Sequence, residues 1–145
     1  MVMSFDRYMR DTVQPMRDEL TRIGIEELRT PEEVADKLGN EEGTALLVIN
    51  SVCGCAAGQC RPGVALALEG EAKPDRLYTV FAGQDKEATA AAREQFLAEY
   101  PPSSPSIALF KDGKLVHFIP RHRIEDRSAE MIANDLTAAF QTYCS

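Results

Sequence analysis

The sequence predicts an α/β fold in which a mixed central sheet is covered by helices on both faces. Strand and helix patterns alternate along the chain, as they do in proteins built on a largely parallel sheet. The run Thr44–Asn50 is apolar without alternation, which is typical of a strand buried on both faces. Further on, Asp112-Gly113 separates two strand-like segments and predicts an antiparallel hairpin. With 145 residues, the chain is predicted to form a single domain, residues 1–145.

An extra helical segment, residues 1–24, is predicted ahead of the sheet. Its apolar residues recur about every 3.6 positions, as on one face of a helix. They are Phe5, Tyr8, Met9, Val13, Met16, Leu20 and Ile23. Pro15 lacks an amide donor, so we expect a kink or two consecutive helices there. Gly24 is the expected end of the segment.

The other elements follow from local signals. Thr30-Pro31-Glu32-Glu33 is a capping box with proline at the first helical position. Pro62 predicts a kink in the helix that follows the second strand, and Asp85 is the expected N-cap of the next helix. The predicted strands are Ile25–Arg29, Thr44–Asn50, Leu77–Ala82, Ser106–Phe110 and Lys114–Ile119, and the predicted helices run from Thr30 to Gly39, Gly54 to Leu68, Lys86 to Tyr100 and Ser128 to Tyr143.

Charge and hydropathy exclude several classes of partner. With 23 acidic and 16 basic residues, a net charge of −7 and no basic block, the chain is expected to bind neither nucleic acid nor an anionic membrane. The longest apolar stretch, Ala45–Ile49, is far shorter than the roughly 20 residues of a membrane-spanning helix. Residues 1–10 lack the apolar core of a secretory signal. We therefore expect a cytoplasmic protein.

Three of the four cysteines lie close together, and two of them stand where a buried strand passes into a helix. Open α/β folds place their sites at this edge of the sheet. The N-terminus of a helix lowers the pKa of a cysteine, so Cys53 is predicted to be a reactive thiolate if the helix begins near Gly54. Ser51 is expected to add a hydrogen bond, and Gly54 to let the backbone bend and keep Cys53 accessible. Cys55 is then a resolving thiol, because a disulfide in so small a ring is easily reduced.

The other two cysteines have more ordinary interpretations. Cys60 comes nearly two helical turns after Cys53, about 10 Å along the axis, and is expected to be a buried packing residue. Cys144 is expected to be an incidental thiol, although a mobile tail would carry it to the site. Three clustered cysteines also suit zinc or copper, but no second Cys-x2-4-Cys pair is present. His117 and His122 are expected at the surface or in packing, so no metal site is predicted.

A proline-rich loop, residues 101–106, directly precedes a predicted strand. Proline restricts its own backbone and that of the residue before it. We predict that Ser104-Pro105 is a cis bond facing the cysteines, where it exposes backbone groups to a bound peptide or thiol. A trans loop that only ends the preceding helix is the alternative.

The residues from Ser104 to Val116 resemble the thioredoxin segment of cis-proline, strand, tight turn and strand. The departure is the motif, since thioredoxins carry Cys-x-x-Cys and this chain carries Cys53-Gly54-Cys55. That departure resembles the bacilliredoxin family, and the similarity runs over nearly the whole chain. It rests on Val48 to Gly58, Arg61-Pro62, Phe81 to Ala90, Pro102 to Ser106, His117 to His122 and the closing helix that ends at Cys144. Cys60 has no counterpart in the family pattern.

The resemblance implies a thioredoxin-like three-layer fold and a thiol–disulfide oxidoreductase that acts on mixed disulfides between bacillithiol and protein cysteines. Cys53 would attack the bacillithiol sulfur, and Cys55 or a second bacillithiol would clear the adduct. Bacillithiol would be a cosubstrate, with no tightly bound cofactor, and bacillithiolated proteins would be the partners. Ser51, Gly54, Ser104 and Pro105 would contact substrate. Three alternatives stay open at this point: a protein disulfide isomerase, a non-enzymatic redox sensor and a metal–thiolate domain.

Overall fold

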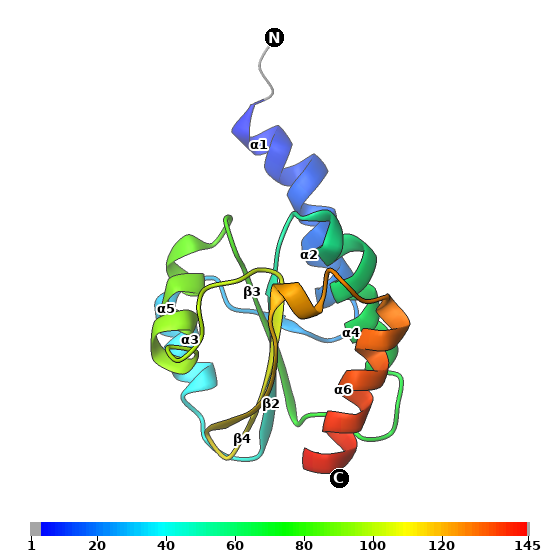
Figure 1. The fold of residues 1–145 in the computed structure, drawn as a ribbon. Coiled ribbons are helices and arrows are strands. Elements are labelled where there is room, and N and C mark those ends of the chain that lie inside the picture. Colours follow the sequence, from blue (N-terminus) through cyan, green and yellow to red (C-terminus); the bar gives the residue numbers. More distant parts are fainter. Residues whose placement is uncertain (1–3, 145) are drawn as a thin grey trace.

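A five-stranded mixed sheet forms the centre of the computed structural model, which describes residues 4–144 (Figure 1). Its strand order is β1-β3-β2-β4-β5. The strands are β1 (Glu26–Glu27), β2 (Thr44–Asn50), β3 (Arg76–Phe81), β4 (Ser106–Lys111) and β5 (Lys114–Ile119). β3 pairs in parallel with β1 and β2, whereas β4 pairs antiparallel with β2 and β5. The predicted fold class is confirmed.

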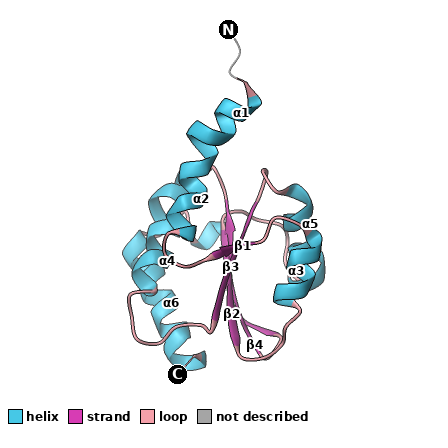
Figure 2. Cartoon of the chain, turned by 180° about the vertical axis from the view of Figure 1, so that it is seen from behind, coloured by secondary structure: helices cyan, strands magenta, loops and turns pink. Residues whose placement is uncertain are grey.

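Helices cover both faces of the sheet (Figure 2). One face carries α2, α4 and α6, and the other carries α3 and α5. The α-helices are α1 (Phe5–Tyr8), α2 (Gln14–Thr21), α3 (Pro31–Leu38), α4 (Arg61–Ala67), α5 (Lys86–Phe96) and α6 (Ala129–Tyr143). Two π-helical turns, η1 (Met9–Val13) and η2 (Ala56–Cys60), and a 3-10 turn, η3 (Arg121–Arg123), complete the helical structure. None of the helices among residues 4–144 is long and apolar enough to span a membrane.

The alternating side chains of β2 divide the core into two clusters. Leu46 and Val48 enter the cluster under α2, α4 and α6, while Leu47 and Ile49 enter the cluster under α3 and α5. All seven residues of β2 are buried, as the unbroken apolar run predicts. Because β2 is central and covered on both sides, its carboxyl end is a rigid base for the loop that carries the cysteines.

Both predicted proline interruptions take the form of a π-helical turn. The amide of Gln14 donates to the carbonyl of Met9, and that of Arg61 donates to the carbonyl of Ala56, five residues earlier in each case. Each of these two donors is followed at once by a proline, Pro15 or Pro62. Inside a regular α-helix, a proline ring would clash with the carbonyl four residues before it, and the wider π-helical turn relieves this clash.

Most local signals act as predicted. Thr30 Oγ1 accepts from the amide of Glu33 at 3.1 Å, and the Asp112-Gly113 turn has positive φ at both residues (49° and 82°). Two elements were predicted to be longer than they are in the structure. β1 keeps only two residues, and Ile25 and Leu28 on either side of it are buried in the two core clusters. α5 ends at Phe96, where Leu97 leaves the helix and becomes buried.

Asp85 corrects another prediction. It occupies the N-cap position of α5, but its carboxylate makes no capping hydrogen bond. It binds the buried Arg17 instead, with Nη1 and Nη2 at 2.7 and 3.1 Å. The same guanidinium contacts Glu27 at 2.6 Å and lies over the ring of Phe81, so it ties α2 to β1, β3 and α5. These ion pairs raise the pKa of Arg17 above its ordinary value, against the opposing effect of burial.

Candidate functional site

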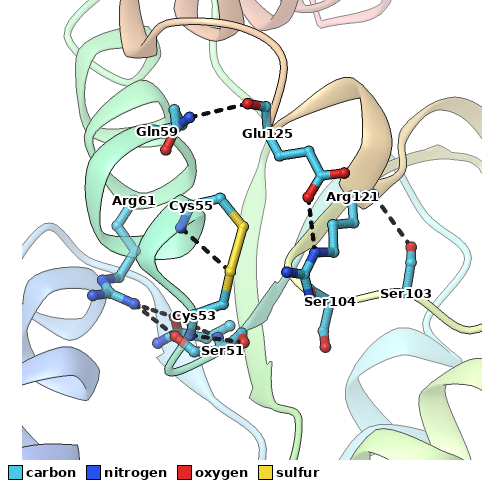
Figure 3. The surroundings of a disulfide bond; sticks show 10 residues. Ser51, Cys53, Cys55, Gln59, Arg61, Ser103, Ser104, Arg121 and Glu125 are labelled. Atoms are coloured by element: carbon cyan, nitrogen blue, oxygen red, sulfur yellow. Dashed lines mark hydrogen bonds and ion pairs between the residues drawn. A yellow bond between two sulfur atoms is a disulfide. The ribbon is translucent and has the colours of Figure 1, made fainter.

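Cys53 and Cys55 lie at the carboxyl end of β2 and form a disulfide, with Cα atoms 5.4 Å apart (Figure 3). The carbonyl of Cys53 accepts from the amide of Ala57 at 3.3 Å, so the helical turn begins directly after Cys53. The amide of Cys55 donates to Cys53 Sγ at 3.3 Å. Cys53 therefore caps the helix with its sulfur, in the way that a serine or aspartate oxygen does at other helices.

This geometry favours a thiolate at Cys53 in the reduced protein. An amide that points at the sulfur and the positive end of a helix both stabilise negative charge on it. Both cysteines are partly exposed, and Val52 beside them is 45% exposed, so substrates have access from solvent. The arrangement places two sulfurs together at a partly exposed helix start, a position at which thiol–disulfide exchange is chemically possible.

A buried polar network holds the loop from below. Ser51 Oγ accepts from the amide of Cys53 at 3.2 Å. The Arg61 guanidinium, 2% exposed, donates to Asn50 Oδ1 at 2.8 Å and to the carbonyl of Ser51 at 3.0 Å. Asn50 Oδ1 also accepts from the amide of Ser51 at 2.9 Å. Sequence patterns identified Ser51 but not Asn50 or Arg61. Asn50 is visible as a polar residue at the end of an apolar strand, but the sequence does not indicate that Arg61 binds it.

The same network connects the loop to α2. Arg61 Nε lies 3.2 Å from Glu19 Oε2, and the side-chain amide of Asn50 donates to the carbonyl of Met16 at 3.2 Å. The N-terminal helical segment therefore packs against the strand-to-helix loop through ion-pair and hydrogen-bond contacts as well as through Leu20 in the core. The loop is fixed from two directions, by its own helix and by α2.

The Ser104-Pro105 peptide bond is cis, as predicted. Pro105 is buried at the start of β4, whereas Ser104 is partly exposed on the side that faces the disulfide in Figure 3. The carbonyl of the preceding Ser103 accepts from Arg93 Nη2 and from Ser106 Oγ, both at 3.1 Å. The loop is thus held at the edge of the site, since β4 pairs with β2 and places Ser106 opposite Ile49, shortly before the cysteine pair.

A side of the site that the sequence did not reveal comes from η3 and the residues after it. Arg121 Nη1 donates to the carbonyl of Ser104 at 3.3 Å, and its Nε donates to Glu125 Oε2 at 3.2 Å. The backbone carbonyl of Glu125 accepts from Gln59 Nε2 at 3.4 Å. Arg121 and Glu125 therefore lie between the cysteine helix and the cis-proline loop (Figure 3). In the sequence, Arg121 stood out only as part of the stretch His117 to His122 that resembles the family.

The prediction for Gly54 needs a correction. Gly54 has no positive φ, unlike Gly24, Gly43, Gly83 and Gly113, so the backbone at this position does not require glycine. A Cβ built there would have no neighbour within 4 Å. Glycine leaves the outer face beside the disulfide open, but the bend of the backbone here is one that other residues can also adopt.

The remaining cysteines lie away from this site. Cys60 is fully buried in the core under α4 and α6, and burial raises the pKa of its thiol to about 12. Cys144 packs against the same core at the other end of the sheet, near Thr44 at the start of β2. Its position corrects the idea of a mobile tail that reaches Cys53, because the length of β2 separates the two, about 20 Å. Burial also raises the pKa of Cys144.

The two histidines do not join the cysteines. His117 Nε2 lies 2.7 Å from Asp135 Oδ1 and helps to attach β5 to α6, and His122 is exposed on η3. Within residues 4–144, no group of three or more His, Cys, Asp or Glu side chains is arranged to hold a metal ion.

Comparison with known proteins places this chain in a family. The model of the Disulphide isomerase family matches residues 8–144. A bacilliredoxin of Geobacillus kaustophilus is 57% identical over 145 residues and one of Halalkalibacterium halodurans is 55% identical over 144, each match covering 99% of both chains. The chain belongs to the bacilliredoxin family. A bacilliredoxin of Salinibacter ruber, 56% identical, matches 94% of this chain and 81% of its own length.

Solved thioredoxin structures share the fold of this bacilliredoxin. A thioredoxin mutant from Halobacterium salinarum superposes with a TM-score of 0.57 at 17% identity and covers 85% of this chain and 93% of its own. Mitochondrial thioredoxin 3 from Saccharomyces cerevisiae gives 0.56 at 18% identity and covers 86% and 98%. These likenesses establish the thioredoxin fold. Together with the family, they support a thiol–disulfide oxidoreductase.

Proposed function

We propose that this bacilliredoxin reduces mixed disulfides between bacillithiol and protein cysteines, with Cys53 as the nucleophile. The observation that carries the proposal is the disulfide of Cys53 and Cys55 at a helix start, with the Cys55 amide directed at Cys53 Sγ. The family name of its relatives supports bacillithiol as the thiol involved.

The first step begins from the dithiol form of the protein. The Cys53 thiolate attacks the bacillithiol sulfur of the mixed disulfide and forms a new S–S bond with it. The old S–S bond breaks, and the target cysteine leaves as a thiolate that takes a proton from water. No net oxidation occurs in this step, since one disulfide replaces another.

The second step removes bacillithiol from Cys53. The Cys55 thiolate attacks Cys53 Sγ, the bacillithiol thiolate leaves, and the Cys53–Cys55 disulfide forms. A second bacillithiol thiolate is the competing nucleophile, and it yields bacillithiol disulfide and free Cys53. The enzyme disulfide returns to the dithiol when two thiols of the cell's low-molecular-weight pool attack it in turn and leave as their own disulfide.

The other predicted site residues have supporting parts in this proposal. Ser51 holds the amide of Cys53, and Gly54 leaves the outer face of the pair open. Ser104 and Pro105 offer backbone groups beside the cysteines to the incoming mixed disulfide. Each of these parts follows from position and contacts, and each is testable by substitution.

The test uses a protein carrying bacillithiol on one cysteine as substrate. Wild type should release the free target thiol, a Cys53→Ser variant should not, and a Cys55→Ser variant should accumulate bacillithiol on Cys53, detected by mass spectrometry of the intact protein. Cys60→Ser serves as the matched control and should behave as wild type. Full activity of Cys53→Ser, or an adduct located on Cys55, would overturn the assignment. Thiol oxidation without any turnover would favour a redox sensor.

Disulfide isomerase activity is the second candidate, favoured by the description of the matching family model. Isomerisation needs a nucleophile that attacks a substrate disulfide and later leaves, so Cys53 alone would be sufficient. Reactivation of a scrambled disulfide protein without bacillithiol measures it. Loss of this activity in Cys53→Ser but not in Cys55→Ser is the expected pattern for an isomerase.

A further inference from the structure

A groove of about 470 Å³ is formed by the loop before the cis-proline, the end of β5 and η3. Its lining is mainly apolar and includes Tyr100, Pro102, Phe118 and Pro120. The rings of Tyr100 and Phe118 are in contact, with centroids 4.5 Å apart and planes tilted by 37°. The volume falls within the range of about 300–1,000 Å³ that is typical of small-molecule sites.

The groove is continuous with the surroundings of the disulfide. Ser103, Arg121 and Glu125 line the groove and also appear around the cysteines in Figure 3. Arg121 stands at the junction, since it donates to the carbonyl of Ser104 in the cis-proline loop. Arg121 therefore connects the surroundings of Cys53 to the groove (Figure 3).

Arg121 lies where the groove meets the surroundings of the disulfide (Figure 3), and its charge is balanced in part by the Glu125 carboxylate, 3.2 Å away, which also lines the groove. Arg121 and His122 both line it and are exposed. The hydrogen bonds to Glu125 and Ser104 use two of the five donors of the Arg121 guanidinium. The other donors suit a carboxylate, because guanidinium forms short, charge-assisted hydrogen bonds with carboxylate oxygens.

We propose that this groove binds the small-thiol half of the mixed disulfide, and that Arg121 recognises a carboxylate on it. The inference rests on the proposed function and names the half of the substrate that the groove receives. The apolar and aromatic lining then holds the remainder of the thiol, and the cis-proline loop separates it from the departing protein.

The chemistry of the reaction favours the small thiol over the protein half as the occupant. The small thiol stays attached to Cys53 after the target protein has left, and a second molecule of it is the alternative nucleophile in the next step. It is also the feature that different target proteins share. A pocket of small-molecule size that shares Arg121 and Glu125 with the surroundings of the disulfide (Figure 3) therefore matches the half that is present throughout turnover.

The experiment compares one carrier peptide capped with either of two isosteric thiols, 3-mercaptopropionate and 3-mercaptopropionamide. The quantity measured is kcat/KM for release of the peptide thiol, expressed as the ratio of the carboxylate cap to the amide cap. Replacing Arg121 with methionine should lower this ratio about tenfold relative to wild type, as expected for loss of one charge-assisted contact. Arg121→Lys should restore part of it.

Arg123→Met is the matched control, because Arg123 belongs to the same 3-10 turn and is exposed, but does not line the groove. It should keep the wild-type ratio. An Arg121→Met variant that slows both caps equally would overturn the proposal and assign Arg121 to support of the cis-proline loop. If the wild-type protein released no peptide thiol from any capped peptide, including one capped with bacillithiol, the proposed function itself would be overturned.

A second measurement does not depend on turnover. In the Cys55→Ser variant carrying bacillithiol on Cys53, the ring resonances of Tyr100 and Phe118 should shift relative to the unloaded variant. Unchanged resonances would contradict occupation of the groove. Shifts that appear only when a capped peptide is bound would assign the groove to the protein half.

Discussion

Replacing Arg61 with methionine is predicted to destabilise the protein by about 3–5 kcal/mol. The guanidinium is buried and donates to the Asn50 side chain and the Ser51 carbonyl. A hydrogen bond made by a charged group contributes about 1.5–3 kcal/mol, so the two together account for this loss. Glu19 is 40% exposed and regains water, and its ion pair adds little. The loss is a large part of the 5–15 kcal/mol that is typical of a whole domain.

The same substitution should slow thiolate chemistry at Cys53. Arg61 lies 3.0 Å from the Ser51 carbonyl, and the two residues from Ser51 to Cys53 span at most about 7 Å. Its charge is therefore on the order of 10 Å from the sulfur. At an effective dielectric constant of about 20, the attraction is about 1.7 kcal/mol, which corresponds to about one pH unit. Glu19 opposes part of it, so the pH midpoint of Cys53 alkylation should rise by up to about one unit.

Two measurements check these values. Urea unfolding of the reduced protein gives the change in the free energy of unfolding, and the pH dependence of iodoacetamide alkylation in a Cys55→Ser background gives the midpoint for Cys53. Arg123→Met is the control, because Arg123 is exposed on η3 and is not one of the residues that hold Asn50 and Ser51. It should change neither the free energy of unfolding nor the alkylation midpoint. A loss of stability below 1 kcal/mol together with an unchanged midpoint would refute the reasoning.

Three further predictions concern other positions. The pKa of the Cys60 thiol is about 12 in the folded protein and 9.0 in the unfolded chain. The contribution of this buried neutral thiol to the free energy of unfolding is therefore complete below pH 9, and up to about 4 kcal/mol of it is lost as the pH rises toward 12. The free energy of unfolding of wild type should thus fall more steeply than that of Cys60→Ala between pH 9 and 11, and parallel curves would contradict this. Gly54→Ala should raise the free energy of unfolding by about 0.4–1 kcal/mol, since its backbone and surroundings accept a Cβ. Arg17→Met should lower it by about 3–5 kcal/mol in urea unfolding, because the carboxylates of Asp85 and Glu27 lose their buried partner, and Arg17→Lys should restore only part.

Features that depend on neighbouring residues were predictable from the sequence. The β4–β5 hairpin follows from the Asp112-Gly113 turn, and the disposition of β2 follows from its apolar run. The start of the cysteine helix and the cis bond before Pro105 likewise follow from short stretches of chain. In each case the backbone conformation is set by residues within a few positions of one another.

Features that depend on distant residues were not predictable in this way. The Asp85 carboxylate was expected to cap its own helix, but Arg17, 68 positions earlier, binds it more strongly as a bidentate ion pair. Arg121 meets Ser104 17 positions before it, across two strands. A local pattern contains no information on which charged side chain the fold will bring opposite, and such contacts complete the candidate site.

The spacing of the cysteine pair has its own consequence for the chemistry. In a helix N-cap the side chain accepts from the amide of the second or third helical residue. With a single residue between the cysteines, the amide that donates to Cys53 Sγ belongs to Cys55 itself. In the proposed mechanism, the group that would stabilise the attacking thiolate and the thiol that would resolve its adduct are therefore parts of one residue. Because Ser51 and Arg61 fix the start of this turn from below, the proposed attack of Cys55 on the adduct would require no rearrangement of the loop backbone.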